Sequence, residues 1–325
     1  MKPETRQRLD EAFTRPASES FRQLRELSTR TGSDHIEYLF NSPSALACKI
    51  ERSRYVGEQV RSQNGRVLDF GSGCGFLAGA LAAEGAAEVV GIECNDPRRH
   101  AAEYLVQRVF QATNVEFKTT IDDLPPASFD AVILANVISH VRDVPAVLMG
   151  LRNLLKWSGL IFVEDNNNLQ SVLVRHGLRT RVWPGERLAG EIVYRNQRAE
   201  HIRSTCPEIP GDEVDALADA TYGLTFSEID AFVNHRLAQG PDPFPTAALR
   251  WRAPVEPDTG QYHENAFRPS EVETLLFNLG FVPVRTGAKH VFDYKRAPLA
   301  SWVFKTFPRL SLNVSPAFEV LAAKK

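Results

Sequence analysis

The sequence has few cysteines, no excess of charge of either sign and no long apolar run. Only four of its 325 residues are cysteine, and no two have the C-x-x-C spacing of zinc ribbons or thioredoxin-type redox sites. Lysine plus arginine (38) nearly balance aspartate plus glutamate (40), which excludes a globally basic protein that coats nucleic acid. The apolar runs 131–134 and 160–163 fall far short of the roughly 18 residues of a membrane span. Residues 1–10 are charged and lack the apolar core of a signal peptide, so a soluble, cytoplasmic protein is expected.

What the sequence does contain is an alternation of short apolar strands with helices. Residues 1–65 are expected to be mainly helical. Strand followed by helix followed by strand predicts a parallel, doubly wound α/β sheet, and such sheets bind ligands at the carboxyl ends of their strands. Asp96 followed by Pro97, and Ser270 followed by Glu273, are expected to begin helices. Strands are expected at 66–70, 88–93, 115–118, 131–135, 160–163, 281–285 and 318–322.

A glycine-rich loop follows the first expected strand, in the stretch Val67-Leu-Asp-Phe-Gly-Ser-Gly-Cys-Gly75. Glycines at this point let a ligand approach the backbone closely. The dinucleotide fingerprint G-x-G-x-x-G would need a third glycine at Phe76, which is absent. Asp69, two residues before the first glycine, is unfavourable beside a pyrophosphate and favourable beside a ligand that carries an ammonium and a sulfonium.

This stretch resembles motif I, D-x-G-x-G-x-G, of the class I S-adenosylmethionine-dependent methyltransferases. The resemblance covers about 66–165 and resumes at 268–323. It implies a Rossmann-like, seven-stranded sheet and S-adenosylmethionine as cofactor. Residues 166–267, where the alternation of strands and helices breaks, are expected to be a helical insertion between strands five and six. This organisation divides the chain into an N-terminal helical segment (1–65), a cofactor-binding core (66–165 with 268–325) and an insertion (166–267) that serves as acceptor-binding lid.

The same resemblance implies a set of cofactor contacts at the ends of the strands. Glu93 corresponds to the acid that binds the ribose hydroxyls, and Asp122 to the acid near the adenine, although Asp123 fits the spacing almost as well. The whole expected set is Asp69, Gly71, Ser72, Gly73, Gly75, Glu93, Cys94, Ile121, Asp122 and Asn136.

Candidate catalytic residues follow from what an acceptor requires, because a hydroxyl needs a general base whereas a free amine or a carboxylate does not. His140, after the fourth strand, is the candidate base; its alternative role is to cap the next helix. His263 and Glu264 lie where the insertion returns to the core, and they either reach the acceptor or belong to a solvated loop. Asp165-Asn166 resembles a metal-ligand pair of the catechol-type enzymes, but Ala135-Asn136 lacks the partner acid, so no metal is expected.

The insertion separates its charges along the sequence. Seven acids and no base occupy 208–230, after a stretch rich in arginine. Either the arginines line a pocket for an acidic acceptor, with Arg179, Arg181, Arg195 and Arg198 as the foremost candidates, or the two stretches pair with each other. The arginines of the first stretch are residues 175, 179, 181, 187, 195, 198 and 203.

The expected partner is a small-molecule or glycan acceptor, and a homo-oligomer is possible. Nucleic acid is a weak candidate because aromatic residues that could stack bases are sparse in the insertion. Two other functions stay open at this point. One is a non-enzymatic, methyltransferase-like partner protein, and the other is an NAD-dependent reductase, which the glycine spacing disfavours.

Overall fold

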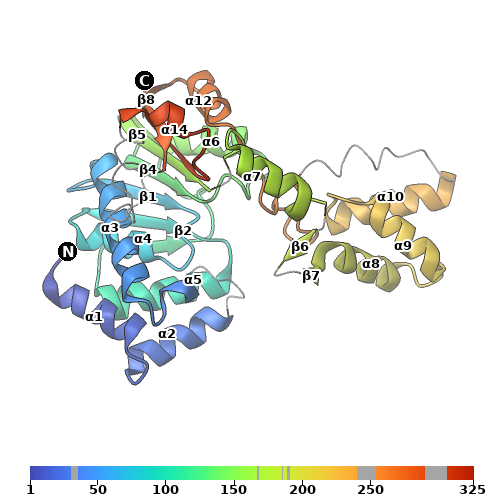
Figure 1. The fold of residues 1–325 in the computed structure, drawn as a ribbon, viewed down its shortest axis with the longest axis horizontal. Helices are drawn as coiled ribbons and strands as arrows, with labels where there is room; N and C mark the ends of the chain where they lie inside the picture. Colours follow the sequence, from blue (N-terminus) through green and yellow to red (C-terminus); the bar gives the residue numbers. More distant parts are fainter. Residues whose placement is uncertain (31–35, 167, 185, 189–190, 240–252, 290–305) are drawn as a thin grey trace.

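The computed structural model describes residues 1–30, 36–166, 168–184, 186–188, 191–239, 253–289 and 306–325 (Figure 1). Seven strands form one sheet in the order β3-β2-β1-β4-β5-β9-β8. Strands β1 to β5 are parallel to one another, and β9 is antiparallel to both of its neighbours, β5 and β8. The predicted doubly wound sheet is thereby confirmed. Its strands are β1 (Arg66–Phe70), β2 (Glu88–Ile92), β3 (Val115–Lys118), β4 (Phe129–Ala135), β5 (Leu155–Asp165), β8 (Phe281–Ala288) and β9 (Phe318–Lys324).

Both faces of the sheet are covered, as the continuous apolar strands require. In β4, Val132 and Leu134 point to one face, and Ala131 and Ile133 to the other. Helices α6 (Val144–Leu154) and α12 (Pro269–Asn278) pack on the first face. Helices α3 (Pro43–Gln59) and α4 (Phe76–Ala83) pack on the second. This arrangement leaves the carboxyl ends of β1 and β4, where the strand order reverses, as the place for a ligand.

The N-terminal segment is helical, as predicted, and packs on α4 and on the helix after β2. Aromatic rings hold this contact together: Phe76 lies 6.0 Å from Phe13 and 5.5 Å from Phe110, measured between centroids. The elements here are α1 (Pro3–Thr14), α2 (Glu19–Arg30), η1 (Glu37–Leu39), α5 (Asp96–Tyr104) and the π-helical turn η2 (Leu105–Phe110).

Two predicted helix starts are wrong by a residue or two. The cap of α5 is Asn95, whose side chain accepts a hydrogen bond from the Arg98 amide at 3.0 Å, and Asp96 is already helical. Helix α12 begins at Pro269, and Glu271 accepts from the Arg268 amide at 2.8 Å. In both cases a polar side chain one residue from the predicted cap, Asn95 or Glu271, accepts the hydrogen bond from a backbone amide at the start of the helix.

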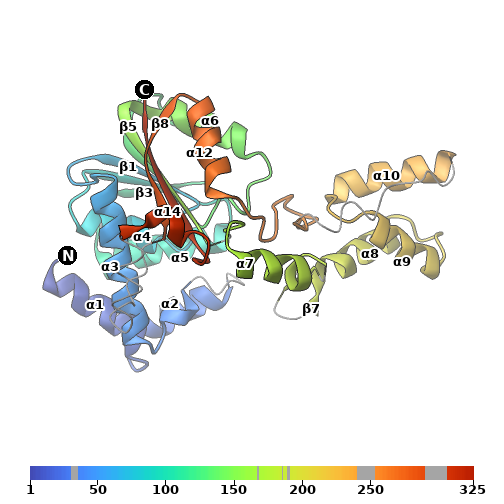
Figure 2. The same ribbon diagram turned by 45° about the horizontal axis from the view of Figure 1, so that its top comes forward.

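The chain between β5 and α12 forms mainly helices. In Figures 1 and 2, α8, α9 and α10 stand apart from the sheet, and α7 bridges the gap to them. These helices have an apolar core of their own, which includes Ile202, Leu217 and Ile229. The elements are α7 (Val172–Gly177), η3 (Leu178–Val182), β6 (Arg187–Leu188), β7 (Glu191–Ile192), α8 (Val193–Thr205), α9 (Gly211–Ala220), α10 (Phe226–Gln239) and, beyond β8, α14 (Pro308–Ser311).

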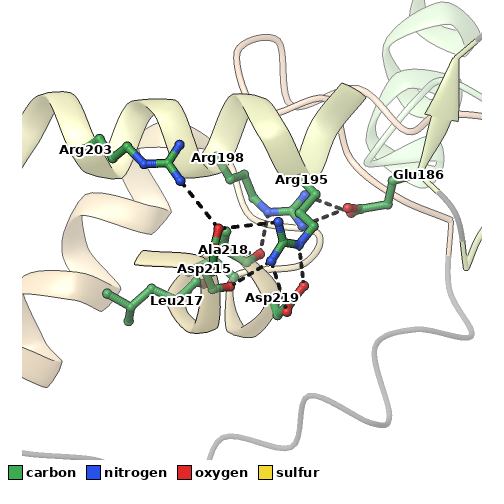
Figure 3. A network of polar contacts seen from close by, with 9 residues as sticks. Glu186, Arg195, Arg198, Arg203, Asp215, Leu217, Ala218 and Asp219 are labelled. Atoms are coloured by element: carbon green, nitrogen blue, oxygen red, sulfur yellow. Dashed lines mark hydrogen bonds and ion pairs between the residues drawn. The ribbon is translucent and has the colours of Figure 1, made fainter. Parts of the chain in front are cut away.

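The separated charges of the insertion pair with each other. Arg198 and Glu186, both buried, make two parallel hydrogen bonds of 2.8 Å, and Arg198 Nε also donates to the carbonyl of Ala218 (Figure 3). Arg195 donates to Asp219 at 2.8 Å. The pairing of the two stretches therefore holds for Arg195, with Asp219 and Asp215, and for Arg203, with Asp215, whereas Arg198 pairs with an acid of its own stretch. Arg179 and Arg181 are exposed and make no ion pair with any described residue.

No helix in the described part of the chain is long and apolar enough to span a bilayer.

Candidate functional site

The glycine loop lies between the carboxyl end of β1 and the first turn of α4. Gly71, Gly73 and Gly75 all have positive φ, between 54° and 74°. A Cβ on Gly75 would lie 2.7 Å from the Cβ of Ala102, so this glycine permits close packing of α4 against α5. A Cβ on Gly73 would meet nothing within 4 Å. The middle of the loop is thus open to a ligand, while its end is fixed by packing.

Glu93 fixes the loop to the neighbouring strand. Its buried carboxylate accepts hydrogen bonds of 2.9 Å from the amides of Gly73 and Asn95, one on each oxygen. A carboxylate can accept about four hydrogen bonds, so both oxygens keep capacity for further donors such as ribose hydroxyls. The position is the one predicted for this residue, at the end of β2.

Asp69 is the most unusual acid at this edge. Its side chain is buried, and its Oδ2 atom has no hydrogen-bond partner in the described part of the chain. Burial raises the pKa of the Asp69 carboxyl to about 7, although Lys49 and Arg52 oppose the shift. Buried polar atoms are normally hydrogen-bonded, so an orphaned carboxylate oxygen here indicates a missing donor.

Two more orphaned atoms belong to segments at the same edge of the sheet. Ser72 Oγ, in the glycine loop, and Asn136 Oδ1, directly after β4, are buried and make no hydrogen bond with the described residues. Asn136 also adopts a positive φ of 58°. Its backbone amide donates a hydrogen bond of 2.7 Å to the carbonyl of Glu164, which helps to hold this conformation. Three unmet polar atoms therefore gather at the ends of the two central strands. This is the chemistry expected of residues that bind a polar cofactor.

The remaining predicted cofactor residues lie on loops beside this edge. Ile121 is half-buried against the core, and its neighbour Asp122 is exposed, with its carboxylate accepting from the Thr120 hydroxyl at 2.6 Å. Cys94 is exposed, and Gln261 donates to its sulfur at 3.7 Å. Asp123, the alternative acid near the adenine, is exposed like Asp122.

His140 follows β4 in a short turn, and the segment that returns from the insertion holds it in place. Its Nδ1 lies 3.0 Å from the carbonyl oxygen of Tyr262, and its own carbonyl accepts from the Tyr262 amide at 3.0 Å. A carbonyl can only accept, so neutral His140 carries its proton on Nδ1. The lone pair is then on Nε2, which makes no hydrogen bond with the described residues.

His263 and Glu264 lie on the same returning segment. His263 Nδ1 is 3.2 Å from the hydroxyl of Tyr194, which also donates to Glu256 at 3.2 Å. Burial, and then Glu256, raise the pKa of the Tyr194 hydroxyl. Glu264 has a positive φ of 55°, and its carbonyl accepts from the Trp183 indole at 2.9 Å. The structure thus joins the predicted His263 to helix α8 through Tyr194.

The sequence-based reasoning missed a group of charges on α3. Arg52 binds both oxygens of Glu164, the buried residue near the end of β5, and Lys289 reaches the same carboxylate at 2.7 Å. Burial alone would raise the pKa of Glu164, but Arg52 and Lys289 hold it below its ordinary value. Lys49, one turn before Arg52, lies near this group. The spacing of 49 and 52 indicated a shared helix face, but nothing in the sequence placed that face over the glycine loop.

The side chains of Asp165 and Asn166, the pair that resembles metal ligands of the catechol-type enzymes, are hydrogen-bonded to protein groups. Asp165 Oδ2 accepts from the Ser139 amide at 3.1 Å, and Asn166 Oδ1 accepts from Lys289 at 2.9 Å. Among the described residues, no three His, Cys, Asp or Glu side chains are grouped to hold a metal ion.

Comparison with known proteins gives matches over the glycine loop and the strands around it. The sequence model of a methyltransferase domain family matches residues 68–161. A ubiquinone biosynthesis O-methyltransferase of Idiomarina loihiensis is 30% identical over 175 residues, which are 52% of this chain and 68% of that protein. The enzyme of the same name from Neisseria meningitidis serogroup C is 32% identical over 127 residues, 38% of this chain and 53% of that protein. The chain thus spans about half to two thirds of the length of these relatives.

Solved structures of similar fold include an S-adenosylmethionine dependent methyltransferase from Mesorhizobium loti, with 15% identity and a TM-score of 0.46 over 84% of this chain and 95% of that one. Another is a SAM dependent methyltransferase from Aquifex aeolicus, with 14% identity and a TM-score of 0.46 over 93% of this chain and 98% of that one.

Proposed function

The chain belongs to the class I S-adenosylmethionine-dependent methyltransferases, and we propose on that basis that it methylates an oxygen or nitrogen atom of a small-molecule or glycan acceptor. S-adenosylmethionine supplies a methyl group activated by its sulfonium. The acceptor atom would attack the methyl carbon in line and displace the sulfur, leaving S-adenosylhomocysteine, and a hydroxyl acceptor would give its proton to a base. The names of the relatives favour an oxygen acceptor.

The observation that carries this proposal is the set of three orphaned polar atoms at the ends of β1 and β4: Asp69 Oδ2, Ser72 Oγ and Asn136 Oδ1. Leaving such groups unmet costs roughly 1–3 kcal/mol each, so a fold keeps them where a ligand meets them. A purely structural protein would gain stability from losing them. The open approach to Gly73 supports the same interpretation.

Each residue of this edge has a task in the proposed site. Asp69 would meet the cofactor's amino group, and Glu93 its ribose hydroxyls, while Gly71, Gly73 and Gly75 allow the chain to pass close to it. Ile121 and Asp122 would border the adenine. Asn136 and Cys94 would line the site between the cofactor and the returning segment.

His140 is proposed as the general base for a hydroxyl acceptor. The Tyr262 carbonyl fixes the proton on Nδ1 and leaves Nε2 to take the acceptor's proton. A base of this kind contributes about 10²- to 10⁴-fold to the rate. His263 and Glu264 are proposed to border the acceptor, held by Tyr194 and by the contact with Trp183.

The insertion, residues 166–267, is proposed to cover the acceptor. The support is the set of contacts that its returning segment makes with the end of β4 and the end of β2. The Tyr262 and Asn265 amides bond to the carbonyls of His140 and Ser139, and Gln261 contacts Cys94. Arg142 pairs with Glu228 of α10 at 2.8 Å.

The first test is calorimetric titration of S-adenosylhomocysteine into the purified protein, with NAD as control. Micromolar binding of S-adenosylhomocysteine alone is expected. Binding of NAD instead would indicate a reductase. Failure of a folded sample to bind either would favour a non-enzymatic, methyltransferase-like partner protein.

The second test is the variant His140→Gln, assayed by formation of S-adenosylhomocysteine in cell extract and then on the purified acceptor. With a hydroxyl acceptor, kcat should fall about 10²- to 10⁴-fold while S-adenosylhomocysteine affinity stays unchanged. An unchanged kcat on a hydroxyl acceptor would remove His140 from the mechanism.

A further inference from the structure

The segment that returns from the insertion forms a short hairpin over residues 254–263. The backbone amides of His263 and Glu256 donate to carbonyls of the opposite strand, at 2.8 and 2.9 Å, on either side of the antiparallel bridge between Val255 and Tyr262. Side chains alternate along an extended strand, and those of directly or diagonally opposed residues can share a face. Glu256 and His263 therefore lie on the same face of the hairpin.

Tyr194 of α8 stands opposite this face. Its side chain is buried, and its hydroxyl lies 3.2 Å from Glu256 Oε1 and 3.2 Å from His263 Nδ1. The rings of Tyr194 and His263 also pack edge to face, with their centroids 5.4 Å apart. A single hydroxyl of α8 thus joins the carboxylate and the imidazole of the hairpin.

The direction of these hydrogen bonds follows from what each group can donate. The Glu256 carboxylate only accepts, and it also accepts from the Thr259 hydroxyl at 2.9 Å. The single proton of the Tyr194 hydroxyl goes to Glu256. Burial, and then the charge of Glu256, raise the pKa of that hydroxyl, so it keeps its proton. The Tyr194 oxygen can then only accept from His263, which must carry a proton on Nδ1.

His140 reaches the same protonation state by a different route. Its Nδ1 faces the backbone carbonyl of Tyr262, the residue next to His263. Neutral His140 and neutral His263 thus both carry the lone pair on Nε2. The proton of His140 is fixed by a backbone atom, which a side-chain substitution leaves in place. The proton of His263 is fixed by two side chains, one from α8 and one from the hairpin, and both can be exchanged.

We propose that Tyr194 and Glu256 are positioning residues for His263: they hold its proton on Nδ1, so that His263 meets the acceptor with the lone pair of Nε2. The inference rests on the proposed function, in which His263 borders the acceptor. An imidazole nitrogen with a lone pair accepts a hydrogen bond, so it selects an acceptor molecule that offers an O–H or N–H group. The insertion then does more than cover the acceptor, because α8 determines which polar groups His263 can bind.

The direct test is nitrogen NMR of the full chain with isotopically labelled imidazole rings, at about pH 8, where histidines are ordinarily neutral. The spectrum shows which ring nitrogen carries the proton, and the signals of His263 are those lost in His263→Gln. Wild-type His263 should be protonated on Nδ1. Tyr194→Phe removes the oxygen that accepts from Nδ1, and Glu256→Ala lets the Tyr194 hydroxyl donate to Nδ1 instead. Both variants should therefore move the proton to Nε2.

The spectrum contains its own control, because His140 should keep its proton on Nδ1 in every variant. Tyr104→Phe is the matched control substitution: the Tyr104 hydroxyl donates to Gln23 in the N-terminal segment, and its loss should leave His263 unchanged. Glu256→Ala keeps the rings of Tyr194 and His263, so it tests the proposal even if Tyr194→Phe unfolds the insertion.

A second readout separates positioning from packing. The rate of S-adenosylhomocysteine formation in cell extract should fall about 10- to 100-fold in Tyr194→Phe, as when metal-bound histidines lose the partner that fixes their tautomer. The affinity for S-adenosylhomocysteine should not change. The double variant Tyr194→Phe/His263→Gln should lose no more than His263→Gln alone, because Tyr194 acts through His263.

Three results would overturn the proposal: a proton on Nε2 of wild-type His263, a proton that stays on Nδ1 in both Tyr194→Phe and Glu256→Ala, or additive rate losses in the double variant. Failure of the wild-type protein to bind S-adenosylhomocysteine is distinct, because it would refute the proposed function, whereas the proton of His263 is located without any ligand.

Discussion

The cofactor edge of the core and the helical part of the insertion both bury charged residues, and they treat them in opposite ways. In the insertion, Arg198 is almost fully buried and meets Glu186 and the Ala218 carbonyl with good geometry. At the edge of the core, Asp69 is equally buried but keeps an orphaned oxygen. Lys49, nearby, makes no hydrogen bond or ion pair with the described residues, although the charges of Glu164 and Asp69 attract its ammonium.

This difference in pairing distinguishes buried charges that stabilise the fold from buried charges that are available to a ligand. A buried charge that the protein satisfies specifies a fold, because losing one partner leaves the other uncompensated. A buried charge that the protein leaves unmet weakens the fold, and it persists where a ligand meets it. Burial alone does not distinguish the two cases; the list of partners does.

The largest effect is expected from removing Arg198. Arg198→Met leaves the Glu186 carboxylate buried without its cation, which should destabilise the insertion by about 3–5 kcal/mol. Hydrogen exchange of 193–233 should rise strongly, while the affinity for S-adenosylhomocysteine should not change. The double variant Arg198→Met/Glu186→Leu should recover much of the loss. A loss below 1 kcal/mol in the single variant would mean that the pair does not stabilise the insertion.

The second prediction concerns Asp69, whose substitution should stabilise the fold, whereas substitution of Arg198 should destabilise it. The folded-state pKa of this carboxyl is about 7, above the value of about 4 in an unfolded chain. The folded state therefore holds the proton more tightly, and this stabilising contribution is complete below pH 4 and lost as pH rises through 7. Above pH 7, Asp69→Asn should be more stable than wild type, by up to roughly 4 kcal/mol, because a shift of about three pKa units at about 1.4 kcal/mol each is removed.

The same substitution should abolish cofactor binding, since the amide cannot pair with an ammonium. Thermal unfolding between pH 5 and 8.5 measures the first effect, and calorimetry with S-adenosylhomocysteine the second. Asp123→Asn, an exposed acid on a nearby loop, is the control and should change neither stability nor its pH dependence. The raised pKa of Asp69 would be contradicted if the stability of the wild type did not fall, relative to that of Asp69→Asn, between pH 5 and 8.5.

The regular part of the fold was predictable from the sequence because its signals are local. The apolar run of β4 and the glycines after β1 each indicate their own structure without reference to distant residues. The predicted helix starts at Asp96 and Ser270 were wrong because neighbouring residues, Asn95 and Glu271, can make the same cap.

The charges of the site were not predictable in the same way. Lys49 and Arg52 belong to a helix whose sequence shows a charge-balanced surface, and only the packing of α3 against α4 brings them to the glycine loop. The contact of His140 with Tyr262 joins residues 122 positions apart. No local pattern encodes such a contact, so candidate residues could be predicted from the sequence but their partners could not.

The smallest effect is expected from Arg195, which lies on the same helix as Arg198 and pairs with Asp219. Its side chain is 29% exposed and that of Asp219 46%, so solvent screens the pair. Arg195→Gln should cost about 0.2–1 kcal/mol, measured by urea unfolding, and the difference should shrink as salt is raised toward 1 M. Arg179→Gln is the matched control, since this exposed arginine makes no ion pair with the described residues, and it should cost less still. If Arg195→Gln instead cost as much stability as Arg198→Met, burial would not explain the difference between the two arginines. The charges of the insertion would then act as one cooperative network that includes Arg203 and Asp215.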